Sequence, residues 1–155
     1  MSTSLFDAIR NANVSVVTSL VEENPLLTQE KDHRGSTPLL LASYYGHIDI
    51  VRVILNQPQD INAQDASGNT ALMGVCFKGY TEIAELLIES GADVNISNFN
   101  GATALIFAAT FNKPEIATLL LAQGADTNAI DDKGNTALQH AKMQSSTAVI
   151  ALLES

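Results

Sequence analysis

The chain has 155 residues, 46% of them hydrophobic, with 17 acidic and 8 basic residues and a net charge of −9. This length and composition indicate one globular domain and exclude a disordered chain. The negative charge opposes binding to nucleic acid or to an anionic membrane surface, and it suits a partner with a basic surface, although plain solvation is the more common role of such charge.

The N-terminal stretch MSTSLFDAIRNANVS lacks the basic and long apolar segments of a signal peptide. No stretch approaches the roughly 18 consecutive apolar residues that a membrane-spanning helix needs. Cys76 is the single cysteine, so an intramolecular disulfide cannot form. We therefore expect a cytoplasmic protein without a membrane segment.

A repeat of 33 residues organises the chain. TPLL begins at position 37, TALM at 70, TALI at 103 and TALQ at 136. An Asp or Asn stands five positions before each Thr, and a Gly stands two positions before it. The tripeptides DIN at 60–62, DVN at 93–95 and DTN at 126–128 recur at the same spacing. Agreement at one period over so many positions indicates a repeat architecture.

Each repeat reads as a turn followed by two helices. The Asp/Asn-x-x-Gly segment is typical of a turn, because the Asx side chain bonds nearby backbone and Gly tolerates positive φ. The Thr then caps a first helix of about eight residues, which should end at Gly46 in one copy and Gly79 in the next. A second helix follows, and in the copy ending at Gly91 its apolar residues Ile83, Ala84, Leu86 and Leu87 lie on one face.

Three consecutive segments carry a family resemblance: DHRGSTPLLLASYYGHIDIVRVIL, DASGNTALMGVCFKGYTEIAELLIESGADVN and NFNGATALIFAATFNKPEIATLLLAQGADTN. Their pattern resembles the ankyrin repeat. The resemblance implies full repeats at 32–64, 65–97 and 98–130, an N-terminal capping repeat at 1–31 and a C-terminal capping repeat at 131–155. It implies an all-α fold in a single domain, 1–155: an ankyrin-repeat solenoid of five stacked helix-turn-helix pairs with β-hairpin-like loops.

Terminal repeats need a polar outer face. We expect it from Arg10, Asn11, Thr18 and Glu22 at one end and from Lys142, Gln144, Ser145 and Ser146 at the other. The sequence departs from the family where a His usually follows Thr-Pro-Leu; Leu40, Met73, Ile106 and Gln139 stand there, so packing between repeats should replace the hydrogen bonds of that His. Gly74 lies inside a first helix, at a cost of about 1 kcal/mol relative to Ala.

The resemblance places the loop tips and the ends of the first helices on a concave face. Five of the eight aromatic residues fall at such positions. Because aromatic residues dominate interface hot spots, we predict a non-catalytic, monomeric protein-binding module that acts as inhibitor, scaffold or adaptor. The predicted partner-binding residues are Tyr44, Tyr45, Phe77, Lys78, Phe99, Phe111, His33 and Arg34. Alternatively, these aromatic rings cover neighbouring repeats.

No catalytic, metal-binding or cofactor-binding residues are predicted. His33, His47 and His140 form no metal-binding motif, and the resemblance implies that His47 bonds to a neighbouring loop. Cys76 reads as a buried, inert thiol. A self-assembling structural protein and an enzyme subunit are the alternative functions.

Two asparagines, Asn95 and Asn128, lie in the sequence context LLxxGADxN. In animal members of the family the corresponding Asn can be hydroxylated, which makes both residues candidate modification sites by resemblance. The alternative interpretation, which we favour, is that this side chain orders the loop through hydrogen bonds.

Overall fold

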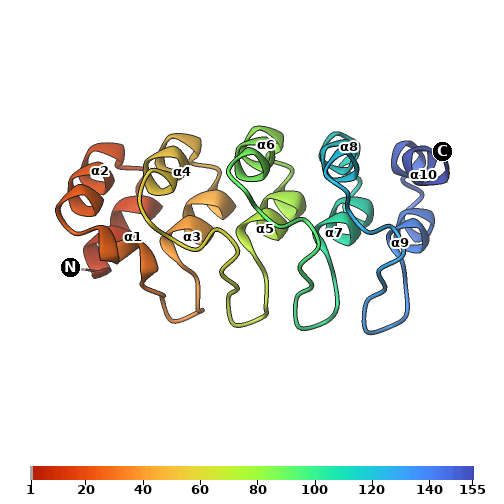
Figure 1. The fold of residues 1–155 in the computed structure, drawn as a ribbon, viewed down its shortest axis with the longest axis horizontal. Coiled ribbons are helices and arrows are strands. Elements are labelled where there is room, and N and C mark those ends of the chain that lie inside the picture. Colours follow the sequence, from red (N-terminus) through yellow and green to blue (C-terminus); the bar gives the residue numbers. More distant parts are fainter. Residues whose placement is uncertain (1) are drawn as a thin grey trace.

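The computed structural model describes residues 2–155, and regular structure in that range consists of ten α-helices and one 3-10 helix. The helices are α1 (Ser2–Arg10), α2 (Val14–Glu23), η1 (Pro25–Gln29), α3 (Pro38–Tyr45), α4 (Ile48–Leu55), α5 (Ala71–Lys78), α6 (Thr81–Glu89), α7 (Ala104–Thr110), α8 (Pro114–Ala122), α9 (Ala137–Met143) and α10 (Thr147–Glu154). They form five consecutive pairs, which stand side by side in one row with the two termini at opposite ends (Figure 1).

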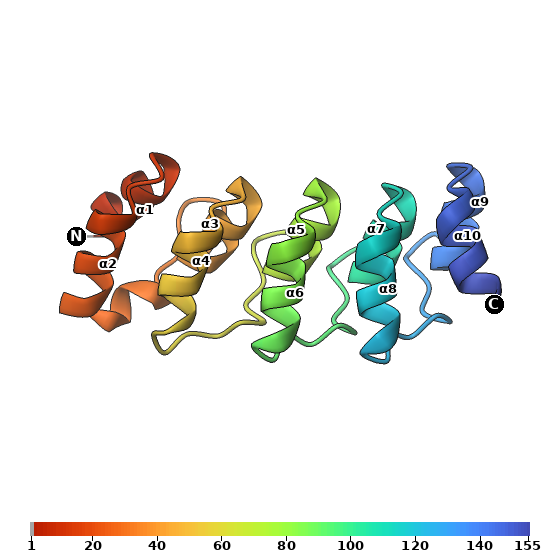
Figure 2. The same cartoon turned by 90° about the horizontal axis from the view of Figure 1, so that it is seen from above.

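The row has two layers. The odd-numbered helices form an inner layer, from whose side the long loops between pairs project, and the even-numbered helices form an outer layer (Figures 1 and 2). Neighbouring helices contact each other more extensively in the inner layer than in the outer layer. Neighbouring pairs are therefore joined mainly through the inner layer, and the prediction of an all-α solenoid of helix pairs is confirmed.

The Thr residues cap the inner helices as predicted. Thr37, Thr70, Thr103 and Thr136 each accept a hydrogen bond from the backbone N–H three residues later. Helices α3 and α5 end at the left-handed residues Gly46 and Gly79, with φ of 78° and 83°. Where the sequence has no Gly, the same positive φ is taken by Asn112 and Ser145, at 56° and 55°.

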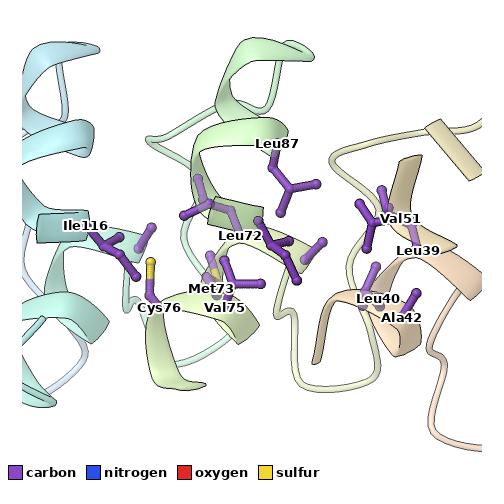
Figure 3. Packing of buried hydrophobic residues seen from close by; sticks show 14 of the residues in the cluster. Leu39, Leu40, Ala42, Val51, Leu72, Met73, Val75, Cys76, Leu87 and Ile116 are labelled. Atoms are coloured by element: carbon purple, nitrogen blue, oxygen red, sulfur yellow. The ribbon is translucent and has the colours of Figure 1, made fainter. Parts of the chain in front are cut away.

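The core lies between successive pairs and is mainly aliphatic (Figure 3). Leu39, Leu87 and Ile116 are almost completely buried there. Leu40, Met73 and Ile106 are also buried, which confirms that packing occupies the place of the usual His. In the last repeat Gln139 instead completes a capping box with Thr136.

The structure corrects the sequence analysis at Ser146 and defines the loop around Pro58, whose conformation the sequence did not predict. Ser146 does not belong to a polar outer face: it is buried just before α10, and its hydroxyl donates to the carbonyl of Ala109 instead of capping that helix. This position faces the preceding pair, so a polar side chain there has to find an internal partner. The loop around Pro58, which breaks the repeat pattern, is tied to η1 because the Thr28 hydroxyl donates to the Pro58 carbonyl at 2.7 Å.

Candidate protein-binding surface

Four of the predicted residues form a continuous aromatic surface on the inner layer. Tyr44 and Tyr45 lie at the end of α3, Phe77 at the end of α5, and Phe111 directly after α7. The ring centroids of Tyr44 and Phe77 are 6.4 Å apart, and those of Phe77 and Phe111 are 4.7 Å apart. We call these four residues the aromatic surface. Their side chains are each 39–41% exposed.

The repeat explains why these rings meet. Tyr44 and Phe77 are 33 residues apart and occupy equivalent places on neighbouring inner helices, while Phe111 occupies the place of Tyr45. These places are the two residues that come before the left-handed residue at the end of the helix, where the chain turns away and leaves side chains uncovered. The 33-residue spacing of the sequence therefore places these aromatic residues side by side in the structure.

The sequence analysis missed one member of this region, Phe107. It lies four residues before Phe111, on the same face of α7, and the two ring centroids are 6.3 Å apart. Phe107 is half-buried and supports the exposed ring of Phe111 from below. Helical spacing was the signal that could have identified it.

Lys78 lies beside the aromatic surface. Its Nζ is 4.9 Å from the centroid of the Tyr44 ring and 5.9 Å from that of Tyr80. These distances are in the range of cation–π interactions. Lys78 therefore adds a positive charge to a surface that is otherwise aromatic.

The structure does not bring Phe99 into this row. Phe99 is 70% exposed at a loop tip and packs over Gly68 of the preceding tip, where an added Cβ would lie 2.7 Å from the Phe99 Cδ1 atom. It lines a different hollow, together with Lys31 and Gln64. His33 is exposed at the first tip, and Arg34 lies next to it, closer to Tyr44 and Tyr45.

A cavity of about 340 Å³ opens between α3 and α5, next to the aromatic surface. Tyr44, Tyr45 and Phe77 line its apolar side, and Asp65 and Arg34 are charged residues at its border. Gly74 also lines it. Because Gly74 has no side chain, it leaves space between the rings of the neighbouring repeats.

The titratable residues have structural roles. The Nε2 atom of His140 lies 2.7 Å from Oδ2 of Asp131, and the backbone N–H groups of Asn135 and Lys133 donate to Oδ1. The hydrogen bond from Asn135, with that from His140 after it, holds the pKa of Asp131 below its ordinary value. Burial raises the pKa of the Cys76 thiol, so the thiolate that reacts is disfavoured, as predicted for an inert cysteine.

His47 behaves differently from the expectation. Within residues 2–155 its side chain makes no hydrogen bond to a loop; its ring packs edge-on against Tyr45 at 6.0 Å. Across the same residues no group of three His, Cys, Asp or Glu side chains could hold a metal ion.

The two candidate modification sites have different surroundings. The Asn95 side chain accepts a hydrogen bond from the Asp126 N–H at 2.8 Å and donates to the Gly124 carbonyl at 3.2 Å. Asn128, which has no following loop of the same kind, makes no side-chain hydrogen bond to residues 2–155. The structural interpretation is therefore confirmed for Asn95, and modification of either residue stays a prediction.

None of the described helices is long and apolar enough to span a bilayer. Comparison with known proteins gives two family matches: "Ankyrin repeats (3 copies)" over residues 5–98 and "Ankyrin repeats (many copies)" over residues 86–141.

Several curated proteins are similar over part of the chain. Ankyrin repeat domain-containing protein 29 of Homo sapiens is 34% identical over 41% of this chain and 21% of its own length. Protein fem-1 homolog C of Homo sapiens is 39% identical over 37% of this chain and 10% of its own length. The serine/threonine-protein kinase VIK of Arabidopsis thaliana is 40% identical over 34% of this chain and 12% of its own length. The chain thus spans less than a quarter of each of these relatives.

Proposed function

Because this chain belongs to the ankyrin-repeat family, whose repeats generally mediate protein–protein interaction, we propose that it is a non-catalytic module that binds a partner protein through its aromatic surface. One observation carries the proposal: four exposed aromatic rings from three successive repeats form one continuous row on the inner layer. Such large, stiff side chains bury much area on binding at a small cost in conformational entropy.

These rings lie outside the buried core. The buried residues between the pairs are mainly Leu, Ile, Val and Ala, and each ring of the aromatic surface keeps about two fifths of its area exposed. Rings that served only to cover a neighbouring repeat would leave little of their area exposed. Contiguous exposed apolar area of this kind usually marks an interaction site.

The acidic net charge supports a partner with a basic surface, mainly by raising the rate of association. The aromatic surface lies on only one side of the molecule, which is consistent with a monomer that acts as an inhibitor, scaffold or adaptor. Self-assembly is the competing function, in which a second copy of the chain would cover the same row.

The test is the triple variant Tyr45→Ala, Phe77→Ala, Phe111→Ala. Partner proteins captured from cells on the wild-type chain would be identified by mass spectrometry and their affinities measured with purified proteins. We expect the variant to keep its helical circular dichroism and to lose about 2 kcal/mol or more of binding free energy, roughly thirtyfold in Kd.

The matched control replaces three exposed apolar residues outside the aromatic surface: Val16→Ala, Leu26→Ala and Ile130→Ala. It should bind as the wild type does. Equal capture by the aromatic variant would refute the proposal, and an unfolded aromatic variant would mean that the rings belong to the core. Concentration-dependent size on gel filtration, abolished by the aromatic variant, would favour self-assembly.

A further inference from the structure

Four equivalent side chains anchor the turns that precede the inner helices: Asp32, Asp65, Asn98 and Asp131. In each, Oδ1 accepts two backbone N–H groups of its own turn. We call these four residues the turn anchors. The other side-chain polar atom of each anchor, Oδ2 in Asp or Nδ2 in Asn, is therefore free to contact a second partner. That second partner differs among the four repeats.

Three of the four anchors have that partner within the protein. Arg10 lies 3.8 Å from Oδ2 of Asp32, and His140 lies 2.7 Å from Oδ2 of Asp131. The amide nitrogen of Asn98 donates to Asn69 at 2.9 Å. For Asp65, no hydrogen bond or ion pair from any side chain in residues 5–155 reaches Oδ2.

Comparison with the last repeat shows what is missing beside Asp65. His140 stands four residues after the capping Thr136, and the equivalent residue after Thr70 is Gly74. The space that an imidazole fills in the last repeat is thus left open beside Asp65. Both Gly74 and Asp65 line the cavity of about 340 Å³ between α3 and α5.

The walls of this cavity suit a planar cation. The rings of Tyr44 and Phe77 are nearly parallel, with an interplanar angle of 5° and centroids 6.4 Å apart. Cations bind aromatic faces within about 6 Å of the centroid. Lys78 already places its ammonium 4.9 Å from the Tyr44 centroid, so an incoming cation would compete with Lys78 for this ring.

We propose that this cavity, the Asp65 pocket, receives an arginine side chain of the partner protein. The proposal rests on the function proposed above and names the chemistry of one contact. The guanidinium would pair with the free oxygen of Asp65 and lie against the ring faces of Tyr44 or Phe77. Arginine fits better than lysine, because its planar group both stacks on aromatic rings and pairs with carboxylates.

Besides Lys78, Arg34 competes with an incoming arginine for the pocket. Arg34 lines it, but its guanidinium forms no ion pair with Asp65, and its side chain is exposed. Its positive charge should weaken binding of an incoming arginine. Removal of this charge in Arg34→Gln is therefore expected to strengthen binding.

The experiment is an NMR titration of the full chain with N-acetyl-arginine amide, and with the neutral analogue N-acetyl-citrulline amide. We expect shifts of backbone amides around Asp65, Gly74 and Phe77 with arginine, and binding of citrulline weaker by about tenfold or more, as for loss of a charge-assisted contact. Equal binding of the two probes, or shifts elsewhere, would overturn the proposal.

Two variants test the residues, each with circular dichroism as a check of folding. Asp65→Asn keeps the turn, because Asn98 makes the same bonds, and it should weaken the arginine probe about tenfold. Gly74→His should fill the pocket as His140 does and block the probe. The matched control Asp131→Asn removes a carboxylate that is already paired and should bind the probe as the wild type does.

A selection of short random peptides on the immobilised protein separates the two proposals. Peptides enriched in arginine that bind Asp65→Asn at least about tenfold more weakly would support both. Peptides without arginine that bind Asp65→Asn normally, yet need Phe77 and Phe111, would overturn the arginine pocket and leave the aromatic surface intact. Peptides whose binding does not change in variants of Asp65, Phe77 or Phe111 would overturn both proposals.

Discussion

Asn95 and Asn128 show at the scale of single residues how an identical motif acquires different roles. Asn95 joins its own loop to the next through Asp126 and Gly124, whereas Asn128 has no following loop of this kind. The hydrogen bonds of Asn95 are exposed, so water can replace part of their stabilising effect when the side chain is removed.

We therefore predict that Asn95→Ala lowers the free energy of unfolding by about 1 kcal/mol, while Asn128→Ala changes it by less than about 0.5 kcal/mol. Urea denaturation followed by circular dichroism measures both. Equal effects of the two substitutions would show that the side-chain bonds of Asn95 do not stabilise the stack.

Asp131 gives a second prediction at this scale, for acidic pH. Because its pKa is lowered in the folded protein, chiefly by the Asn135 N–H, its contribution to stability is complete above the ordinary pKa of about 3.9 and is lost as pH falls through the folded value. The free energy of unfolding of the wild type should therefore fall below about pH 4. Asp131→Asn, which keeps the turn but cannot titrate, should show a smaller fall.

The control for this pH series is the exposed neighbour Asp132, whose carboxylate accepts no hydrogen bond from residues 2–155. Asp132→Asn should keep the acid dependence of the wild type. If Asp131→Asn keeps it as well, the pairing of Asp131 with Asn135 and His140 does not contribute to the pH dependence of stability.

At the scale of elements, two glycines of the inner helices have opposite roles. Gly46 ends α3 at a φ of 78°, and an added Cβ would lie 2.9 Å from the Tyr80 ring. Gly74 lies inside α5, where an added Cβ would make an ordinary contact with Tyr44 at 3.7 Å. Only the first position requires glycine.

We predict that Gly46→Ala destabilises the protein by about 1 kcal/mol or more, through the left-handed conformation and the displaced ring. Gly74→Ala should stabilise it by about 0.5–1 kcal/mol, because alanine is the better helix former. Thermal unfolding of both variants measures the difference. A destabilising Gly74→Ala would mean that the open space beside Tyr44 is needed for the fold.

At the scale of the whole molecule, stability should depend on position in the row. A central pair is packed on both sides, whereas the last pair contacts a single neighbour. Helices α6 and α10 are both outer helices of similar length, so they form a matched comparison.

We predict that backbone amides of α6 exchange with deuterium more slowly than those of α10, because opening a terminal pair exposes one interface rather than two. Native-state hydrogen exchange followed by NMR measures this. Equal protection along the row would mean that the chain opens only as one cooperative unit.

The sequence by itself determined the architecture. The architecture follows from local signals: the repeat length, the capping Thr residues and the glycines at the ends of α3 and α5. Because the same signals recur in successive repeats, each repeat supports the assignment of the others. The aromatic residues Tyr44, Tyr45, Phe77 and Phe111 could be assigned to a surface because they fall outside the apolar pattern of the core. Phe107 was missed because its place in the repeat is otherwise held by Leu41, Gly74 and His140, which share no chemistry.

Only the tertiary structure decided which of these residues meet. Phe99 and Phe111 were both predicted to bind the partner, yet one packs over a neighbouring loop tip and the other joins the aromatic surface. The open side of Asp65 likewise appears only in the structure, where Asp65 and Gly74 line one cavity. The structure of each helix pair is determined by local hydrogen bonds and therefore follows from the repeat pattern. The contacts between helix pairs depend on the size and direction of side chains, which the spacing of residues in the sequence does not reveal.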